Sequence, residues 1–305
     1  MERYNDWMSY SFDDGPINGP KPTATSIFKL HFKQGTEYKK MSYYDALFYN
    51  ARMMKDNYSE PFDVLLSGGI DSEVVVRTFK QEGIKQNVYT FRFENDINIK
   101  DVNSAIQIAK DADIKLNIID WNLQKFFEND AYDLFQKTYS IYPARMLRHA
   151  WFDLLDNIPV MCEGEPYWRR ELRDDFSEKS KWYLWWVEDY FTASIYANTV
   201  GRTIIGEWYN YTPEIVMSYH KLPLVKKLIA DNIPGKQSSW SSRTEIHRHL
   251  WPSIVDKPKL VGYEGPDRPP GQNPDFMIDF YLEVVHGTNN KAYRYSKKEL
   301  ENIFK

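Results

Sequence analysis

Residues 67–72 combine side chains and backbone that suit the binding of a phosphorylated ligand. Gly68 and Gly69 permit a tight turn in which backbone N–H groups approach an anion closely. Asp71 places a carboxylate in this turn, which favours phosphate binding only if a divalent cation bridges the two groups. The segment therefore predicts a loop that binds polyphosphate with a metal ion. The alternative is an ordinary tight turn in which Asp71 only complements the helix dipole.

The residues on either side of this loop predict a strand that enters it and a helix that leaves it. The apolar residues Phe62, Val64, Leu65 and Leu66 form a short run that is typical of a strand buried in a parallel sheet. Apolar side chains recur at helical spacing between Ser72 and Phe79, so a helix N-terminus would point its partial positive charge at the ligand. No Gly-x-x-x-x-Gly-Lys-Ser/Thr string occurs, which excludes a Walker A loop.

Strand and helix patterns continue to alternate along the chain. Strands are expected at residues 87–93, 116–119 and 158–161, and helices at 101–111, 123–139 and 144–155. This alternation indicates an α/β fold with a doubly wound parallel sheet, in which ligands bind at the carboxyl ends of the strands. The C-terminal half is expected to be largely helical, with Trp182, Trp185 and Trp186 on one buried helical face.

We expect two parts in this chain. Residues 1–58 would form an N-terminal part with an irregular arm up to residue 25, a strand around 28–32 and a helix that starts at Ser42. Residues 59–305 would form the nucleotide-binding domain with its helical C-terminal portion. With 305 residues and 42% hydrophobic content, the chain is long enough to bury a sizeable core.

Charge and cysteine content narrow the class of protein. A net charge of −4 is unfavourable for a protein whose main role is to coat nucleic acid. Cys162, the single cysteine, excludes an intrachain disulfide, a four-cysteine zinc site and a Cys-x-x-Cys redox pair. The sequence has no run of 18 apolar residues and no secretory pattern at its N-terminus, so we expect a cytoplasmic protein with no membrane partner.

The string Ser-Gly-Gly-Ile-Asp-Ser at 67–72 resembles the signature of the PP-loop ATP pyrophosphatases, which cleave ATP between its α and β phosphates. The resemblance implies an adenine nucleotide alpha hydrolase-like fold, with ATP and Mg²⁺ as cofactors. Sulfur-inserting members usually need paired cysteines or an iron–sulfur cluster, and the 7-cyano-7-deazaguanine synthases carry a zinc-binding cysteine set. Because this chain has one cysteine, neither set can be assembled.

A narrower resemblance covers roughly residues 42–265, which look like the synthetase domain of asparagine synthetases and beta-lactam synthetases. Four segments carry this likeness: residues 66–72, 89–93, 160–165 and 257–265. Asparagine synthetases begin with a catalytic cysteine on a glutaminase domain, and this chain has no cysteine before position 162. The loop after Gly164 also lacks the aspartate that the family uses as a second magnesium ligand.

The resemblance implies a nucleotide site with named ligands. Residues of the loop and of the second and third segments would bind ATP: Leu66, Ser67, Gly68, Gly69, Asp71, Ser72, Phe91 and Gly164. Asp71 would coordinate Mg²⁺, with Glu165 or its neighbour Glu163 in place of the missing aspartate. Phe91 belongs to the strand end that cradles adenine in the family.

Two further residues are candidates for catalysis. Lys259 would stabilise the negative charge on the α–β bridging oxygen or on an adenylated intermediate, and the excess of Lys and Arg between Lys236 and Lys259 suits this role. Its alternative role is that of a solvated lysine in a basic stretch. Glu207 lies in apolar surroundings and would act as a base; the alternative is a buried structural glutamate.

The resemblance implies an ATP-dependent, AMP-forming ligase that adenylates a small-molecule carboxylate and passes the acyl group to an amine or ammonia. One alternative is adenylation of a nucleobase or amide carbonyl for nucleotide or nucleic-acid modification, in which a nucleic acid would carry the substrate. The other is a module that binds nucleotide without turnover. The sequence does not specify the oligomeric state.

Overall fold

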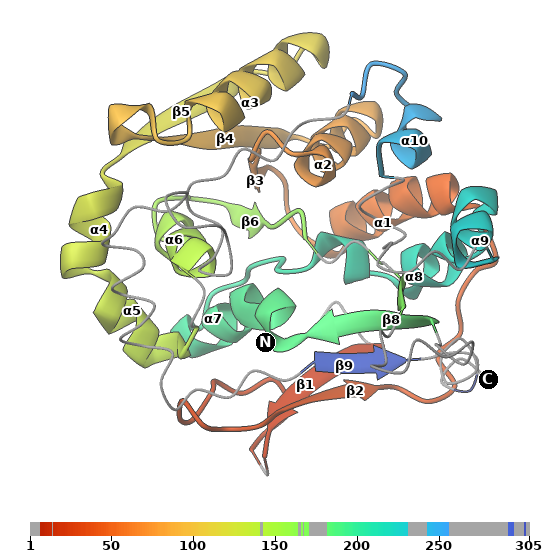
Figure 1. The fold of residues 1–305 in the computed structure, drawn as a ribbon, viewed down its shortest axis with the longest axis horizontal. Helices are drawn as coiled ribbons and strands as arrows, with labels where there is room; N and C mark the ends of the chain where they lie inside the picture. Colours follow the sequence, from red (N-terminus) through yellow and green to blue (C-terminus); the bar gives the residue numbers. More distant parts are fainter. Residues whose placement is uncertain are drawn as a thin grey trace.

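The computed structural model describes residues 7–13, 15–140, 143–163, 166, 168–170, 182–230, 243–255, 292–295 and 302. A four-stranded parallel sheet lies at the centre of this fold (Figure 1). Its strands are β3 (Phe62–Leu65), β4 (Gln86–Phe93), β5 (Leu116–Trp121) and β6 (Ile158–Val160). The spatial order is β5-β4-β3-β6 with parallel neighbours throughout. Strands β4 and β5 are thus added in turn on one side of β3, whereas β6 is added on its other side. This reversal creates a switch point between β3 and β6.

Each face of this sheet has its own hydrophobic core, because successive side chains of a strand point to opposite faces. Val64 and Val88 belong to a core that includes helices α1 (Tyr43–Asn57), α2 (Ile70–Gln81) and α3 (Ile99–Asp111). Leu65 and Phe91 belong to a second core that includes α4 (Leu123–Asn129), α5 (Ala131–Thr138), α6 (Pro143–Phe152) and α7 (Thr192–Val200). Helices on both faces confirm the expected doubly wound α/β fold.

Local sequence signals account for several helix boundaries. Ser42 caps α1, since its hydroxyl accepts a hydrogen bond from the Asp45 N–H at 3.1 Å. The single helix expected at 123–139 was wrong, because α4 and α5 are separated at Asp130. Asn129 and Asp130 have low helix propensity because their side chains compete for backbone groups, and Asn129 Nδ2 donates to the carbonyl of Lys125 at 2.8 Å.

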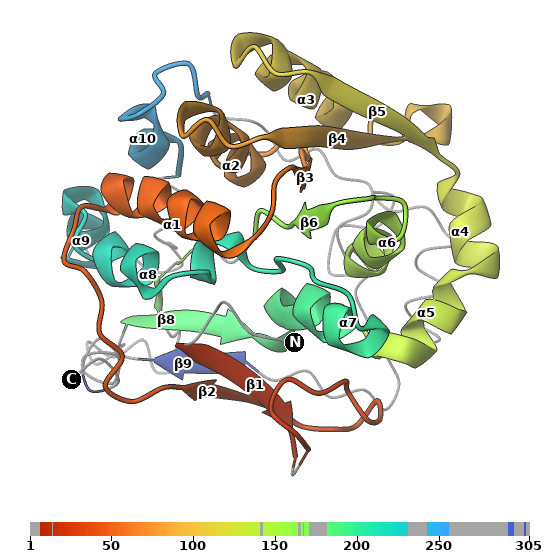
Figure 2. The ribbon, with the colours of Figure 1, turned by 180° about the vertical axis from the view of Figure 1, so that it is seen from behind.

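Two predictions about the rest of the chain were wrong. Residues expected in the irregular arm include strand β1 (Met8–Phe12), which pairs antiparallel with β2 (Phe28–Phe32). The tryptophan-rich segment forms strand β8 (Trp182–Val187) between β7 (Trp168–Arg170) and β9 (Ala292–Tyr295), instead of a helix. A short run of aromatic and β-branched residues favours a strand, and periodicity alone does not distinguish it from a buried helix. Figures 1 and 2 show β1, β2, β8 and β9 together, apart from the parallel sheet.

The remaining described helices of the C-terminal half are α8 (Pro213–Tyr219), α9 (Pro223–Ala230) and α10 (Arg243–Arg248). Tyr10 of β1 and Leu47 of α1 share the first core with Val64 of the parallel sheet. The proposed division at residue 58 stays a prediction. None of the helices in the described ranges has the length and apolar character that a membrane crossing requires.

Candidate functional site

A cavity of about 230 Å³ opens at the carboxyl ends of β3, β4 and β6, next to the switch point of the sheet. Its wall includes seven of the residues that the sequence predicted as nucleotide ligands: Leu66, Ser67, Gly68, Gly69, Asp71, Ser72 and Phe91. The structure thus brings Phe91 of β4 together with the loop that follows β3. Gly164, Glu165 and Lys259 lie outside the described residues, and their roles stay predictions.

The backbone at Gly68 can be formed only by glycine. Its φ is +79°, and a Cβ built there would lie 2.3 Å from the carbonyl oxygen of Asp101. Ser104 donates a hydrogen bond to the Gly68 carbonyl at 2.8 Å, so the loop packs closely on α3. Gly69 has a φ of −85° and is the N-cap of the 12-residue helix α2, whose first turn therefore faces the cavity.

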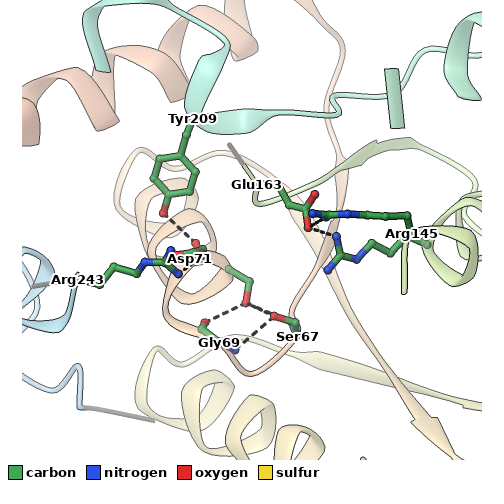
Figure 3. A network of polar contacts seen from close by, with 9 residues as sticks. Ser67, Gly69, Asp71, Arg145, Glu163, Tyr209 and Arg243 are labelled. Atoms are coloured by element: carbon green, nitrogen blue, oxygen red, sulfur yellow. Dashed lines mark hydrogen bonds and ion pairs between the residues drawn. The ribbon is translucent and has the colours of Figure 1, made fainter. Parts of the chain in front are cut away.

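The two serines of the motif hold the shape of the loop. Ser72 Oγ accepts a hydrogen bond from the Ser67 N–H at 3.2 Å and donates to the Gly69 carbonyl at 3.1 Å. The Gly69 N–H approaches Ser67 Oγ at 3.4 Å. Ser72 is only 2% exposed. Its hydroxyl, interpreted from the sequence as a phosphate donor, thus bonds to the backbone of the loop that lines the cavity. Figure 3 shows Ser67 and Gly69 of this loop.

Asp71 is held by two residues that are distant in sequence. Arg243 Nη1 lies 2.7 Å from Asp71 Oδ2, and the Tyr209 hydroxyl donates to the Asp71 carbonyl at 3.1 Å (Figure 3). The ion pair is partly exposed, with 18% of the Arg243 side chain and 29% of the Asp71 side chain accessible. Arg243 stands at the start of α10 and lines the cavity. The sequence signal for it was only the basic excess between residues 236 and 259.

A second group of charges lies on the β6 side of the cavity. Arg145 and Arg148, one turn apart on α6, both contact the same oxygen, Oε1, of Glu163 (Figure 3). Arg148 and Glu163 line the cavity. Sequence reasoning missed both arginines, although their i, i+3 spacing on a predicted helix was visible. Glu163, considered beside Glu165 as a metal ligand, is therefore engaged by two guanidinium groups.

An aromatic wall closes the cavity near β4. Phe91 and Trp151 both line it and pack face to face. Asn98 positions this end of β4, since its side chain donates to the Phe91 carbonyl at 2.7 Å and accepts from the Phe93 N–H at 2.9 Å. Trp151 was not predicted from the sequence, because only the tertiary fold brings α6 to β4.

Glu207 lies outside the residues that line this cavity. It is 6% exposed, and both of its carboxylate oxygens lie within hydrogen-bond distance of Ser194 Oγ, at 3.0 and 2.9 Å. The next residue, Trp208, donates its N–H to the Met161 carbonyl at 3.2 Å, which places this segment beside the end of β6. This geometry supports the structural interpretation of Glu207 over its role as a base.

Cys162 lines the cavity but is a poor nucleophile. Its side chain is buried, and the thiol contacts the Leu65 carbonyl at 3.7 Å. Burial raises the pKa of the Cys162 thiol, and the nearby charge of Asp71 raises it further. The thiol is therefore neutral in the physiological range, whereas nucleophilic attack requires the thiolate.

The donors at this site fit magnesium better than a transition metal. Asp71 and Asp101 are the two aspartates among the residues that line the cavity. The described part of the chain contains no group of three or more His, Cys, Asp or Glu that would enclose a metal ion. Mg²⁺ needs no such cage, since it is commonly bound by one or two carboxylates together with water and substrate phosphates. Asp71 beside a phosphate-binding turn fits this requirement.

Comparison with known proteins gives one match to a sequence family. Residues 63–150 match the model of the family described as Queuosine biosynthesis protein QueC. The matched segment contains the loop, β4 and most of α6, and it ends before Cys162. The match supports a PP-loop ATP pyrophosphatase site and does not confirm the narrower resemblance to asparagine synthetases. No curated protein matches this sequence.

Three solved structures align with this chain at low similarity. An NH3-dependent NAD synthetase from Campylobacter jejuni subsp. jejuni NCTC 11168 has 17% identity and a TM-score of 0.30 over 41% of this chain and 58% of that chain. A glutamine-dependent NAD+ synthetase from Acinetobacter baumannii has 15% identity and a TM-score of 0.33 over 46% of this chain and 31% of that chain. An NMN synthetase from Francisella tularensis has 15% identity and a TM-score of 0.32 over 81% of this chain and 94% of that chain. TM-scores this low carry no argument about function.

Proposed function

We propose that this protein is an ATP-dependent enzyme of the PP-loop type, which adenylates a substrate and releases pyrophosphate. The observation that carries the proposal is the Ser67–Ser72 loop at the carboxyl end of β3, where the first turn of α2 opens into the cavity. Backbone N–H groups and the helix dipole at this position suit the β and γ phosphates of ATP. The match of residues 63–150 to the QueC family supports this assignment.

Several residues of the cavity wall have a role in this proposal. The backbone of Ser67, Gly68 and Gly69 binds the polyphosphate, and Asp71 holds the magnesium ion. That ion supplies charge neutralisation when bound. Arg148 adds a positive charge on the β6 side of the cavity. Desolvation in such a cavity strengthens electrostatic interactions.

For the acceptor, we propose a small-molecule carboxylate that is adenylated and then joined to an amine or ammonia as an amide. The four segments that resemble the asparagine and beta-lactam synthetases support this choice. Lys259 would stabilise charge in the transition state, and Glu165 or Glu163 would complete the metal site. Glu207 is not given a catalytic role here, because its carboxylate pairs with Ser194 and Glu207 is not among the residues that line the cavity.

A second candidate is adenylation of a carbonyl on a nucleobase or nucleotide. The QueC family match favours this reaction class. The single cysteine argues against a zinc-dependent enzyme of this class, because no four-cysteine zinc site can be assembled from this chain alone. If this candidate holds, the substrate carries a base that can stack on an aromatic side chain.

Product analysis tests the proposal. The protein would be incubated with Mg²⁺ and ATP labelled on the adenine and on the γ phosphate, with pools of carboxylic acids and amines or pools of nucleosides and nucleotides. We expect AMP and pyrophosphate in equal amounts, and the active pool decides between the two candidates. Stoichiometric ADP and phosphate would contradict the PP-loop assignment.

Asp71→Asn provides the matching loss-of-function variant. Because Asp71 carries the metal in this proposal, the substitution should reduce turnover by about 100-fold or more while leaving the melting temperature within a few degrees. Asp120→Asn is the control, since Asp120 pairs with Arg92 on the exposed end of β5 and lies outside the cavity. A melting temperature that falls together with the activity would assign Asp71 a structural role instead.

A further inference from the structure

One oxygen of the Asp71 carboxylate already contacts a positive side chain of the protein. Arg243 Nη1 lies 2.7 Å from Asp71 Oδ2, a normal distance for a charge-assisted hydrogen bond. The two residues are 172 positions apart, and α10 brings Arg243 to the rim of the same cavity as the phosphate-binding loop. The carboxylate that would bind magnesium is therefore paired with a positive charge of the protein itself.

We propose that Arg243 is a positioning residue that exchanges partners during nucleotide binding. It holds Asp71 while the cavity contains no nucleotide, gives up Asp71 Oδ2 to the magnesium ion, and then pairs with the polyphosphate. This inference rests on the proposed ATP-dependent function. It adds a residue of the C-terminal half to the nucleotide site and gives it a defined change of partner.

Charge balance gives the direction of this exchange. A magnesium ion on Asp71 cancels the carboxylate charge that attracts Arg243, and it also repels the guanidinium at short distance. At the same time ATP brings several negative oxygens to the loop at Gly68 and Gly69, and a guanidinium binds phosphate oxygens well. Arg243 lies next to this loop in the cavity wall, so the new partner is close to the old one.

The backbone of Asp71 is held in place while the partner of its carboxylate changes. The Tyr209 hydroxyl donates to the Asp71 carbonyl at 3.1 Å, and the first turn of α2 is anchored on the loop by the Ser72 hydrogen bonds (Figure 3). The short Asp71 side chain on this anchored backbone and the long Arg243 side chain differ in reach, because the arginine has several rotatable bonds. The exchange can therefore take place mainly by movement of Arg243.

Metal binding in the absence of nucleotide tests the first half of the exchange. Terbium(III) would be titrated into the protein, and its luminescence, sensitised by the nearby Tyr209, would be measured. The part of this emission that is lost in Asp71→Asn would report on the site at Asp71. We expect Arg243→Ala to increase the affinity of this Asp71-dependent site by about tenfold or more, because a direct competitor is removed. Arg148→Ala is the charge-matched control, since it removes the same charge from the cavity wall without touching Asp71.

A rise in terbium affinity of equal size in both variants would overturn the competition, because it would reflect only long-range charge. An unchanged or weaker terbium affinity in Arg243→Ala would also overturn the competition. Arg243→Gln serves as a second variant that removes the charge and keeps a polar side chain, in case the alanine variant does not fold. Thermal melting curves of all variants would confirm that they are folded.

Nucleotide binding tests the second half. The affinity for α,β-methylene-ATP without metal would be measured by calorimetry in the wild type, Asp71→Asn, Arg243→Ala and the double variant. Asp71→Asn should increase the metal-free affinity for the analogue both in the wild type and in Arg243→Ala, since a negative charge is lost. We expect the improvement to be larger by about tenfold when Arg243 is present, because only then is an arginine released to the phosphates.

Equal improvements in the two backgrounds would overturn the transfer of Arg243 to phosphate. If no variant bound the analogue with or without magnesium, the proposed ATP function and this transfer would both be contradicted. The terbium result would then still decide whether Arg243 competes for Asp71. The two experiments therefore separate a failure of the inference from a failure of the proposed function.

Discussion

The rings of Phe91 and Trp151 stack with their centroids 4.2 Å apart and their planes 6° from parallel. Phe91 comes from β4 and Trp151 from α6, so the stack joins the parallel sheet to the helix that carries Arg148. Both residues line the cavity beside the phosphate-binding loop. A planar aromatic surface in the same cavity as the loop suits a purine ring, and we expect adenine to pack against it.

The first prediction concerns this aromatic wall. Phe91→Leu keeps an apolar side chain, so its cost in the free energy of unfolding should stay below about 1.5 kcal/mol. Loss of an aromatic contact should raise KM for ATP by about threefold to tenfold, with little change in kcat, because the contact is the same in ground and transition states. Steady-state kinetics and urea unfolding would measure both effects. Phe135→Leu is the control, since Phe135 lies in the same hydrophobic core but not in the cavity wall; an unchanged KM in Phe91→Leu would refute the placement of adenine.

The second prediction compares two adjacent glycines. Gly68→Ala introduces a Cβ at a φ of +79° and 2.3 Å from a backbone oxygen of Asp101, whereas Gly69→Ala meets its nearest neighbour, Ser67 Oγ, at 3.4 Å. Gly68→Ala should therefore reduce the free energy of unfolding by about 2 kcal/mol or more, and Gly69→Ala by about 1 kcal/mol or less. Chemical denaturation of the two variants would measure the difference. Similar losses would mean that the close approach of the loop to α3 is absent in solution.

The third prediction follows from the sequence and separates Lys259 from Lys257. Both lysines lie outside the described residues, and they are two positions apart, so their long-range attraction for ATP should be nearly equal. A lysine that acts in the transition state must change kcat, since uniform binding changes only KM. Lys259→Ala should lower kcat by about 100-fold, or about 2.7 kcal/mol of activation free energy. Lys257→Ala should mainly raise KM, and added salt should reproduce part of this effect; equal, salt-sensitive losses would show that Lys259 belongs only to a basic patch.

The fourth prediction concerns the pH dependence of stability. Burial lowers the pKa of His149 to about 3, and the charges of Arg145 and Arg148 contribute to this shift. The unfolded chain, in which a histidine has a pKa of about 6.5, takes up a proton between these values that the folded chain does not bind. Neutral His149 therefore favours the folded state above pH 6.5, and this contribution falls by up to about 1.4 kcal/mol per pH unit as the pH decreases towards 3.

His149→Gln, which does not titrate, provides the comparison. The difference in unfolding free energy between the wild type and this variant should be largest at pH 7 and above, and it should shrink between pH 6 and pH 4. Urea denaturation over this pH range would measure the difference. A constant difference would show that His149 is accessible to protons in the folded chain.

The sequence by itself determined the elements that build the nucleotide site. The apolar run before Gly68, the helical spacing after Ser72 and the alternation of patterns up to residue 161 predicted β3, α2 and the parallel sheet. These signals are local, because a buried strand, a glycine turn and an amphipathic helix each leave their own pattern over a few residues. The strand β8 was missed because its short, continuously apolar run carries no periodicity that distinguishes strand from helix. The strand β1 does alternate, with Met8, Tyr10 and Phe12 separated by serines, but the surrounding residues rich in Pro, Gly and Asp favoured an irregular arm.

Only the tertiary structure decided which distant side chains meet the loop. Arg243 reaches Asp71 from 172 positions further along the chain, Arg145 and Arg148 meet Glu163 beyond the end of β6, and Trp151 stacks on Phe91. Such contacts depend on the order of strands and on how helices pack over them, and no local pattern encodes either. The same packing brought Glu207 to Ser194, and Glu207 is not among the residues that line the cavity. The sequence could not show this, because a glutamate in an apolar run is equally compatible with a structural hydrogen bond and with catalysis until its partner is known.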